Sequence, residues 1–216
     1  MGYYSANNSI KLIQYHAHSP VKINFPDVFN FNPLILKIIE LYKTRQSVRR
    51  YSEVKVNHDV LAHCLEAARL APSASNSQPW KFIIVDQEPV RTQIAQATFS
   101  EIVPFNKFVI QAPVIIVILI DKPKLITRIA MKLKKRDWQL LDIGIVAAHF
   151  CLQAAEDGLG TCMLGWFDEK KVKEILKIPA GKTVGLLIAA GYAPEGYPLR
   201  MKIRKPLDEI ISFNTY

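Results

Sequence analysis

Apolar residues recur at steps of three and four in several stretches of this chain, and this spacing predicts amphipathic helices. The first helix begins at Asn32-Pro33, where a capping side chain precedes a proline in the first turn. Further helices are expected from Asn57 to just before Pro72, over about 88–101, and from Asp168. Residues 1–32 show no clean period, so we expect an extended arm there.

The most regular stretch is DWQLLDIGIVAAHFCLQAAEDGLG, residues 137–160. Steps of three and four join one apolar stripe, and Gly158 supplies a stop; the stripe is Trp138, Leu141, Ile145, Ala148, Leu152 and Ala155. The other faces carry Ile143, Val146, Ala147 and Phe150, so this helix is apolar nearly all round. It therefore needs cover on most sides, from its own core or from a partner subunit.

Short apolar runs predict strands at about 81–86, 113–121, 161–164 and 183–192. Strands and helices are interspersed, without the strict strand-helix-strand order of a doubly wound sheet. Half of the 216 residues are apolar, which is enough for one good core. We expect one domain over 33–216, preceded by the extension over 1–32.

Several classes of protein are disfavoured. Three cysteines without a CxxC pair argue against a disulfide framework, and His58 and His63 are wrongly spaced to share a metal on a helix. No secretory signal is visible, and the longest apolar block, 112–120, is too short to span a bilayer. The motifs GxSxG, GxGxxG and GxxxxGK[ST] are missing. We expect a cytoplasmic protein without a metal site or a membrane partner.

The net charge is +9, and basic residues gather at 121–136 and 200–205. They either face water or attract phosphorylated small molecules or nucleic acid. Charge alone does not separate these readings. Nucleic acid is the remote alternative, because the aromatic residues needed for base stacking are not interleaved with these lysines.

One candidate anion site is RQSVRRY, residues 45–51. If the segment is extended, Arg45, Ser47 and Arg49 share one face, and two guanidinium groups flank a hydroxyl. Guanidinium donors match phosphate oxygens in pairs. The alternative is an ordinary helix exit, in which the arginines interact with the last carbonyls. The residues alone leave both readings open.

The second candidate is the polar loop APSASNSQPW, residues 71–80. Its serines, Asn76 and Gln78 offer directed hydrogen bonds without charge, and Pro72 and Pro79 restrict the backbone before any ligand binds. Such a loop suits the rim of a flat heteroaromatic ring. A helix stop and turn, with Trp80 in the core, does not explain so many rigidly held polar groups.

These two segments, RQSVRRY and APSASNSQPWKFIIV, together resemble the FMN-dependent nitroreductase family, at that family's usual separation. DIGIVAAHFCLQAAEDGLGTCMLGWF and GYAPEGYPLRMKIRKPLDEII continue the resemblance in family order, so that it runs from about residue 38 to 212. It implies an α+β sandwich, with a central and mostly antiparallel sheet flanked by helices, in an intertwined homodimer. FMN would lie in each of two clefts at the subunit interface.

The resemblance also implies roles for individual residues. Arg45, Ser47 and Arg49 would take the ribityl chain and phosphate, and Gln46 would lie against the flavin ring. Lys202 and Arg204 would complete the phosphate site. The remaining implied contacts are Ser73, Ala74, Asn76 and Gln78 from the other subunit, the backbone of Leu164 and Gly165 near the reactive flavin nitrogen, and Asn106 at the ring.

The implied reaction passes hydride from NAD(P)H through flavin N5 to an electron-poor small molecule such as a nitroaromatic or a quinone. Three alternatives stay open: a relative that consumes the flavin, one that dehalogenates an aromatic, and a flavin carrier without turnover. Two features depart from the family. The segment 1–32 is long and either wraps the partner or is disordered, and the segment 121–136, where members often carry a lid, is short and basic.

Overall fold

The structure is a computed structural model that describes residues 33–121 and 137–216. The predicted arm over 1–32 and nearly all of the basic segment 121–136 lie outside the described residues. The predictions made for them therefore stay predictions.

Four strands form one antiparallel sheet in the order β1-β2-β4-β3. Their bounds are Trp80–Val85 for β1, Val114–Ile120 for β2, Gly160–Leu164 for β3 and Thr183–Gly191 for β4. β2 is central and its first six residues are buried, which explains its continuous apolar sequence. Beyond β3, Ser47 forms a parallel bridge to Thr161, and the Val48 N–H donates to the Thr161 carbonyl at 2.9 Å.

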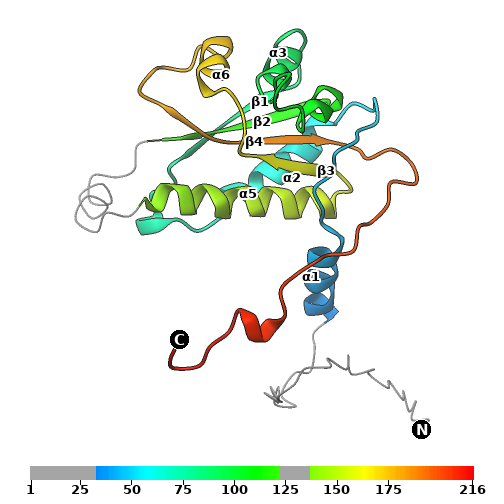
Figure 1. Cartoon of the computed structure of the whole chain (residues 1–216), viewed down its shortest axis with the longest axis vertical. Coiled ribbons are helices and arrows are strands. Elements are labelled where there is room, and N and C mark those ends of the chain that lie inside the picture. Colours follow the sequence, from blue (N-terminus) through cyan, green and yellow to red (C-terminus); the bar gives the residue numbers. More distant parts are fainter. Residues whose placement is uncertain (1–32, 122–136) are drawn as a thin grey trace.

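Helices cover both faces of this sheet (Figure 1). α2 (His58–Arg69) and α5 (Trp138–Glu156) lie on one face, while α3 (Val90–Gln96) and α6 (Glu169–Ile175) lie on the other. Two apolar cores result, one on each side of the sheet. The fold is thus the α+β sandwich that the sequence predicted, built on an antiparallel sheet.

Local capping signals fix several helix starts. The side chains of Asn57, Asp137 and Asp168 accept hydrogen bonds from the first-turn N–H groups of α2, α5 and α6 at 2.9, 3.1 and 3.0 Å. The starts predicted at Asn57 and Asp168 are therefore confirmed.

One prediction about a helix is wrong, and α5 shows which of its apolar faces meets the core. The third helix spans Val90–Gln96 rather than 88–101, because the carbonyls of Ala97 and Thr98 accept bonds from the Asp168 N–H and the Asn106 side chain instead of continuing the helix. α5 packs on its own core with only part of its apolar surface: Leu141 is 63% exposed and Ile145 is 38% exposed. The buried set includes Ile143, Val146, Ala147, Phe150, Cys151 and Ala154.

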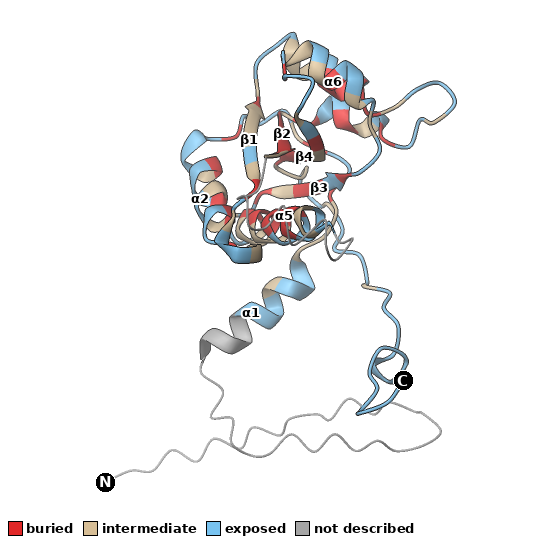
Figure 2. Cartoon of the chain, turned by 90° about the vertical axis from the view of Figure 1, so that its left-hand side faces the viewer, coloured by how far each residue is buried: buried red, intermediate tan, exposed pale blue. Residues whose placement is uncertain are grey.

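α1 (Pro33–Thr44) and the C-terminal stretch after β4 extend away from the sheet and its covering helices (Figure 2). Both carry large exposed apolar side chains, and so does the outer face of α5. These side chains are Ile38, Ile39 and Tyr42 of α1, Leu140, Leu141 and Ile145 of α5, and Leu199, Met201, Ile203, Leu207, Ile210, Ile211 and Phe213 of the C-terminal stretch. Large apolar side chains that gather on a protein surface mark places where another molecule or subunit binds.

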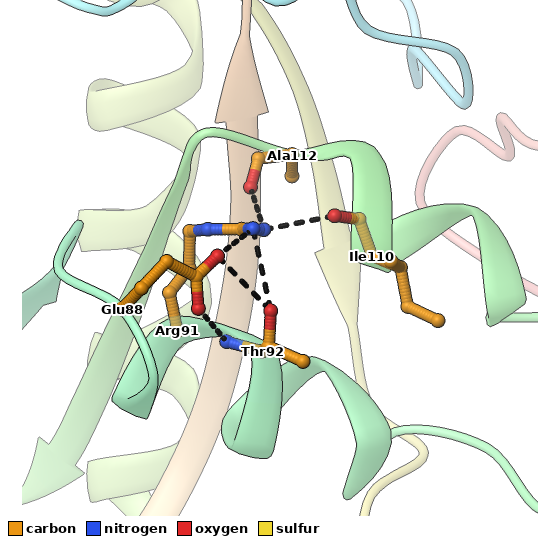
Figure 3. A network of polar contacts seen from close by, with 5 residues as sticks. All are labelled: Glu88, Arg91, Thr92, Ile110 and Ala112. Atoms are coloured by element: carbon orange, nitrogen blue, oxygen red, sulfur yellow. Dashed lines mark hydrogen bonds and ion pairs between the residues drawn. The ribbon is translucent and has the colours of Figure 1, made fainter.

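A network around Arg91 fixes the segment that precedes β2 (Figure 3). One terminal nitrogen of Arg91 donates to the carbonyls of Ile110 and Ala112, each at 2.8 Å, and the other pairs with Glu88. The Arg91 side chain is only 16% exposed, whereas its partner Glu88 is 53% exposed. The network joins α3 to the 3₁₀ turn Lys107–Gln111 and so positions the neighbouring Asn106.

Candidate functional site

The segment after α1 runs along the outer edge of β3. Its extended course is set by the bridge between Ser47 and Thr161. Burial raises the pKa of the Cys162 thiol, while Arg49, a hydrogen bond from Ser47 and Arg200 act against that rise. The extended reading of RQSVRRY therefore agrees with the structure better than a helix exit.

The C-terminal stretch returns to this segment and adds further cations. The ammonium group of Lys202 donates to the carbonyl of Arg45, although the two residues are 157 positions apart. Loss of hydration, followed by repulsion from Arg45 and Arg204, lowers the pKa of Lys202. The structure thus brings together three of the predicted phosphate residues, Arg45, Lys202 and Arg204. Within residues 38–121 and 137–216, none of the ion pairs involves any of these three cations.

The polar loop is strained and held by its own hydrogen bonds. Ser75, Asn76 and Gln78 have φ of 52°, 48° and 46°, the left-handed region that residues other than glycine seldom adopt. The Gln78 N–H donates to the Ser73 hydroxyl at 2.9 Å, and the Gln78 amide donates to the Asn76 side chain at 2.8 Å. Strain of this kind persists only where the surroundings enforce it, and it clusters at ligand sites.

Asp142 on α5 supports this loop and was missed by the sequence analysis. One carboxylate oxygen accepts from the Ala74 N–H at 3.1 Å, and the residue is only 4% exposed. Burial raises the pKa of Asp142, and the bond from Ala74 acts in the opposite direction. The second oxygen, Oδ2, is buried without a hydrogen-bond partner among the described residues. An acidic residue within the apolar run that begins α5 was the signal that could have revealed it.

A third group of predicted residues lies where β3 ends. Leu164 is buried, whereas Gly165 is exposed, and a Cβ built on Gly165 would meet no atom within 4 Å. Asn106 is buried, and its amide nitrogen donates to the carbonyls of Thr98 and Trp166, each at 3.2 Å. It thereby ties the loop after β3 to the end of α3.

Two exposed aromatic side chains flank this point. Phe105 and Trp166 are 60% and 56% exposed, and their ring centroids lie 6.1 Å apart. Their rings form an open apolar surface beside Gly165. The loop after β3 therefore offers open space at Gly165 and aromatic faces to a flat ligand.

Within one chain, the polar loop 71–80 and the arginines of segment 45–51 do not lie together. Ala74 contacts Asp142 near the start of α5. Arg45 instead acts on Cys151, whose pKa is raised to about 11 chiefly by burial, with Thr161 and Arg45 opposing the rise. Along the helix these two positions are separated by about 13 Å, at 1.5 Å per residue. The loop and the cationic segment of the same chain thus belong to different places on the surface.

Other kinds of site find little support. Among the residues that the structure describes, no group of three or more His, Cys, Asp or Glu residues could hold a metal ion. α5 is long and apolar enough to cross a membrane by length and composition, and it is the only such helix in the described parts of the chain. This is weak support for a membrane span, because a core helix passes the same test and α5 packs against α2 and the sheet.

Comparison with known proteins gives a consistent result. The sequence model of the nitroreductase family matches residues 42–105 and 103–192. The chain is 28% identical to an NADH dehydrogenase of Thermus thermophilus, over 77% of this chain and 91% of that protein. It is 26% identical to an iodotyrosine deiodinase of Thermotoga neapolitana, over 83% of this chain and 98% of that protein.

The solved structures agree. An FMN-dependent nitroreductase from Clostridium difficile R20291 is 30% identical and superposes with a TM-score of 0.65, covering 82% of this chain and 99% of that structure. The similarity therefore extends over nearly the whole length of these relatives.

Proposed function

Because this chain belongs to the nitroreductase family of oxidoreductases, we propose that it binds FMN and passes hydride from NAD(P)H to an electron-poor small molecule. The observation that carries the proposal is the convergence of Arg45, Lys202 and Arg204, none of which is in an ion pair with the carboxylates of residues 38–121 and 137–216. Cations brought this close repel one another, and a phosphate dianion would offset that repulsion.

The residues fit an FMN group. Arg45, Lys202 and Arg204 would hold its phosphate, and Ser47 and Arg49 the phosphate or the ribityl chain. When bound, the flavin supplies the hydride-transfer chemistry, and the protein contributes orientation, charge and exclusion of water. Backbone groups of Leu164 and Gly165 would lie near the reactive nitrogen of the ring, beside the open space at Gly165.

We propose further that the site is completed by a second copy of the chain. The strained loop with Ser73, Ala74, Asn76 and Gln78 would reach the ring from that copy, because within one chain it lies far from the arginines. Asn106 stays a predicted ring contact. The exposed apolar side chains of α1, the outer face of α5 and the C-terminal stretch would be buried between the two copies. The arm over 1–32 would wrap the partner, and the location would be cytoplasmic.

The cofactor assignment is tested by changing both Arg45 and Arg204 to Ala. We expect the purified variant to lose its yellow colour on dialysis, because two phosphate partners are gone. The control is Arg69→Ala, which removes only an exposed pair with Glu66 and should keep the flavin. Retention of flavin by the double variant at the wild-type level would refute the phosphate assignment.

Dimer formation is tested by light scattering on the full chain, with and without residues 207–216. We expect a dimer for the full chain and a weakened or monomeric state for the truncated one, because truncation removes Ile210, Ile211 and Phe213. A full-length monomer that nevertheless binds FMN tightly would show that one copy suffices.

Reductive dehalogenation is a second candidate reaction, favoured by the similarity to the iodotyrosine deiodinase. Anaerobic turnover of NAD(P)H with a nitroaromatic, a quinone and a halogenated phenol separates the two candidates. Flavin bleaching without turnover of any acceptor would instead favour the flavin carrier.

A further inference from the structure

Gln46 is hydrogen bonded to the C-terminal stretch at both ends of its amide. Its nitrogen donates to the Pro198 carbonyl at 3.0 Å, and its oxygen accepts from the Arg200 N–H at 3.0 Å. The partners lie 152 and 154 residues away in sequence. Only this amide orientation pairs a donor with an acceptor at both positions. The Gln46 amide therefore gives the backbone of residues 198–200 one donor and one acceptor, as a neighbouring strand would.

Further bonds fasten the same two segments. The Arg200 guanidinium donates to the Tyr197 hydroxyl at 2.8 Å and to the Ser47 carbonyl at 3.3 Å. The Tyr197 hydroxyl also accepts from the Arg49 N–H at 3.1 Å. Burial raises the pKa of Tyr197. The hydrogen bonds from Arg49 and Arg200 and the charges of these two arginines outweigh burial, so the pKa of Tyr197 lies below its usual value.

The register of this contact decides where the following cations point. In extended chain, residues two and four positions apart share a face. With Arg200 paired to Gln46, Lys202 falls on the side of Arg45 and donates to its carbonyl. A shift by one residue would turn both Lys202 and Arg204 to the opposite side.

We propose that Gln46 is a positioning residue that sets the register of the C-terminal stretch, so that Lys202 and Arg204 face Arg45. This inference rests on the proposed FMN site and departs from the ring contact that the sequence resemblance implied for Gln46. A residue that acts through the phosphate partners affects only ligands that carry the phosphate. A residue that touches the ring affects every flavin.

The test compares FMN with riboflavin, which has the same ring without the phosphate. Gln46→Met keeps the approximate length of the side chain and removes both hydrogen bonds. We expect FMN binding, followed by quenching of flavin fluorescence, to weaken about tenfold, the effect of losing two ordinary hydrogen bonds. Riboflavin binding and the absorption spectrum of bound FMN should stay unchanged. The control is Gln96→Met, an exposed change on α3.

Tyr197→Phe provides a second variant should Gln46→Met fold poorly. It removes the acceptor for Arg49 and Arg200, so it should also weaken FMN and spare riboflavin. In combination, the two changes should cost less than the sum of the single ones, because both release the same segment.

Equal weakening of FMN and riboflavin, or a shifted flavin spectrum, would overturn the inference in favour of a ring contact. Unchanged FMN affinity in both variants would overturn it as well. A wild-type protein that takes up neither flavin would instead refute the proposed function, and the inference with it.

Discussion

Asn106 offers a sharp test of how the site is held together, because one amide nitrogen joins two loops. It donates to the carbonyls of Thr98 and Trp166 at 3.2 Å from a position that is 6% exposed. In Asn106→Ala both carbonyls lose their donor. Two lost hydrogen bonds with partly unsatisfied partners correspond to a destabilisation of about 2–4 kcal/mol. The loop carrying Gly165 and Trp166 should loosen at the same time.

Asn106→Asp adds a charge-dependent contrast at nearly constant volume. The carboxylate would face two carbonyl oxygens in a buried place, so its folded-state pKa should rise above the ordinary value of about 4. The charged carboxylate lowers the stability of the folded protein once the pH rises above the unfolded pKa, and the loss is complete above the raised folded pKa. The loss shrinks as the pH falls, because the neutral acid can donate to one carbonyl. The deficit relative to wild type should therefore be larger at pH 7 than at pH 5.

Urea unfolding at fixed protein concentration measures both variants, with equal slopes required before the free energies are compared. Asn57→Ala is the matched control: it removes the cap of α2, for about 1 kcal/mol, and should leave turnover unchanged. The reasoning fails if Asn106→Ala stays within about 0.5 kcal/mol of wild type, the range of ordinary surface changes. It also fails if the deficit of Asn106→Asp does not depend on pH.

Two further predictions concern packing and acid stability. A Cβ at Gly191 would lie 2.5 Å from Cδ of Pro113, so Gly191→Ala should lower the unfolding free energy in urea by about 1–3 kcal/mol; Gly181→Ala, which meets no atom within 4 Å, is the control, and equal stability of the two variants would contradict the packing argument. Chiefly through its hydrogen bond, Lys173 holds the pKa of Glu169 below its usual value, so this stabilisation is present above about pH 4.3, the unfolded pKa, and is lost as the pH falls through the folded pKa. Glu169→Gln should show a smaller loss of stability between pH 6 and pH 3 than wild type, by less than about 1 kcal/mol because the pair is partly exposed, and an identical acid profile in both proteins would count against it.

Local signals explain why much of the secondary structure was predictable. Caps at Asn57 and Asp168 act on N–H groups two or three residues away, so the sequence near each helix contains the whole cause. The apolar run predicted a buried strand at about 113–121 for the same reason, and β2 spans Val114–Ile120.

Tertiary contacts decided the core-facing side of α5, which the sequence left open, and the end of α3, which the sequence predicted wrongly. α5 is apolar nearly all round, so its sequence fits more than one stripe, and packing on the sheet buries the face of Val146 and Phe150. α3 ends early because the carbonyl of Ala97 accepts from residue 168, which lies far along the chain, and the carbonyl of Thr98 accepts from Asn106, eight positions on. The spacing of apolar residues along the sequence gives no sign of hydrogen bonds from other segments.

For the site, the sequence by itself determined the chemistry: paired arginines in RQSVRRY, directed amides in a stiff loop, and a basic C-terminal stretch. Only the tertiary structure decided which of these groups meet. It joined Arg45 to Lys202, turned the amide of Gln46 toward residues 198 and 200, and placed the buried Asp142 beneath the loop at Ala74. The physical reason is that a side chain's type is a local property, whereas its partners depend on how β3, α5 and the returning C-terminal stretch pack together.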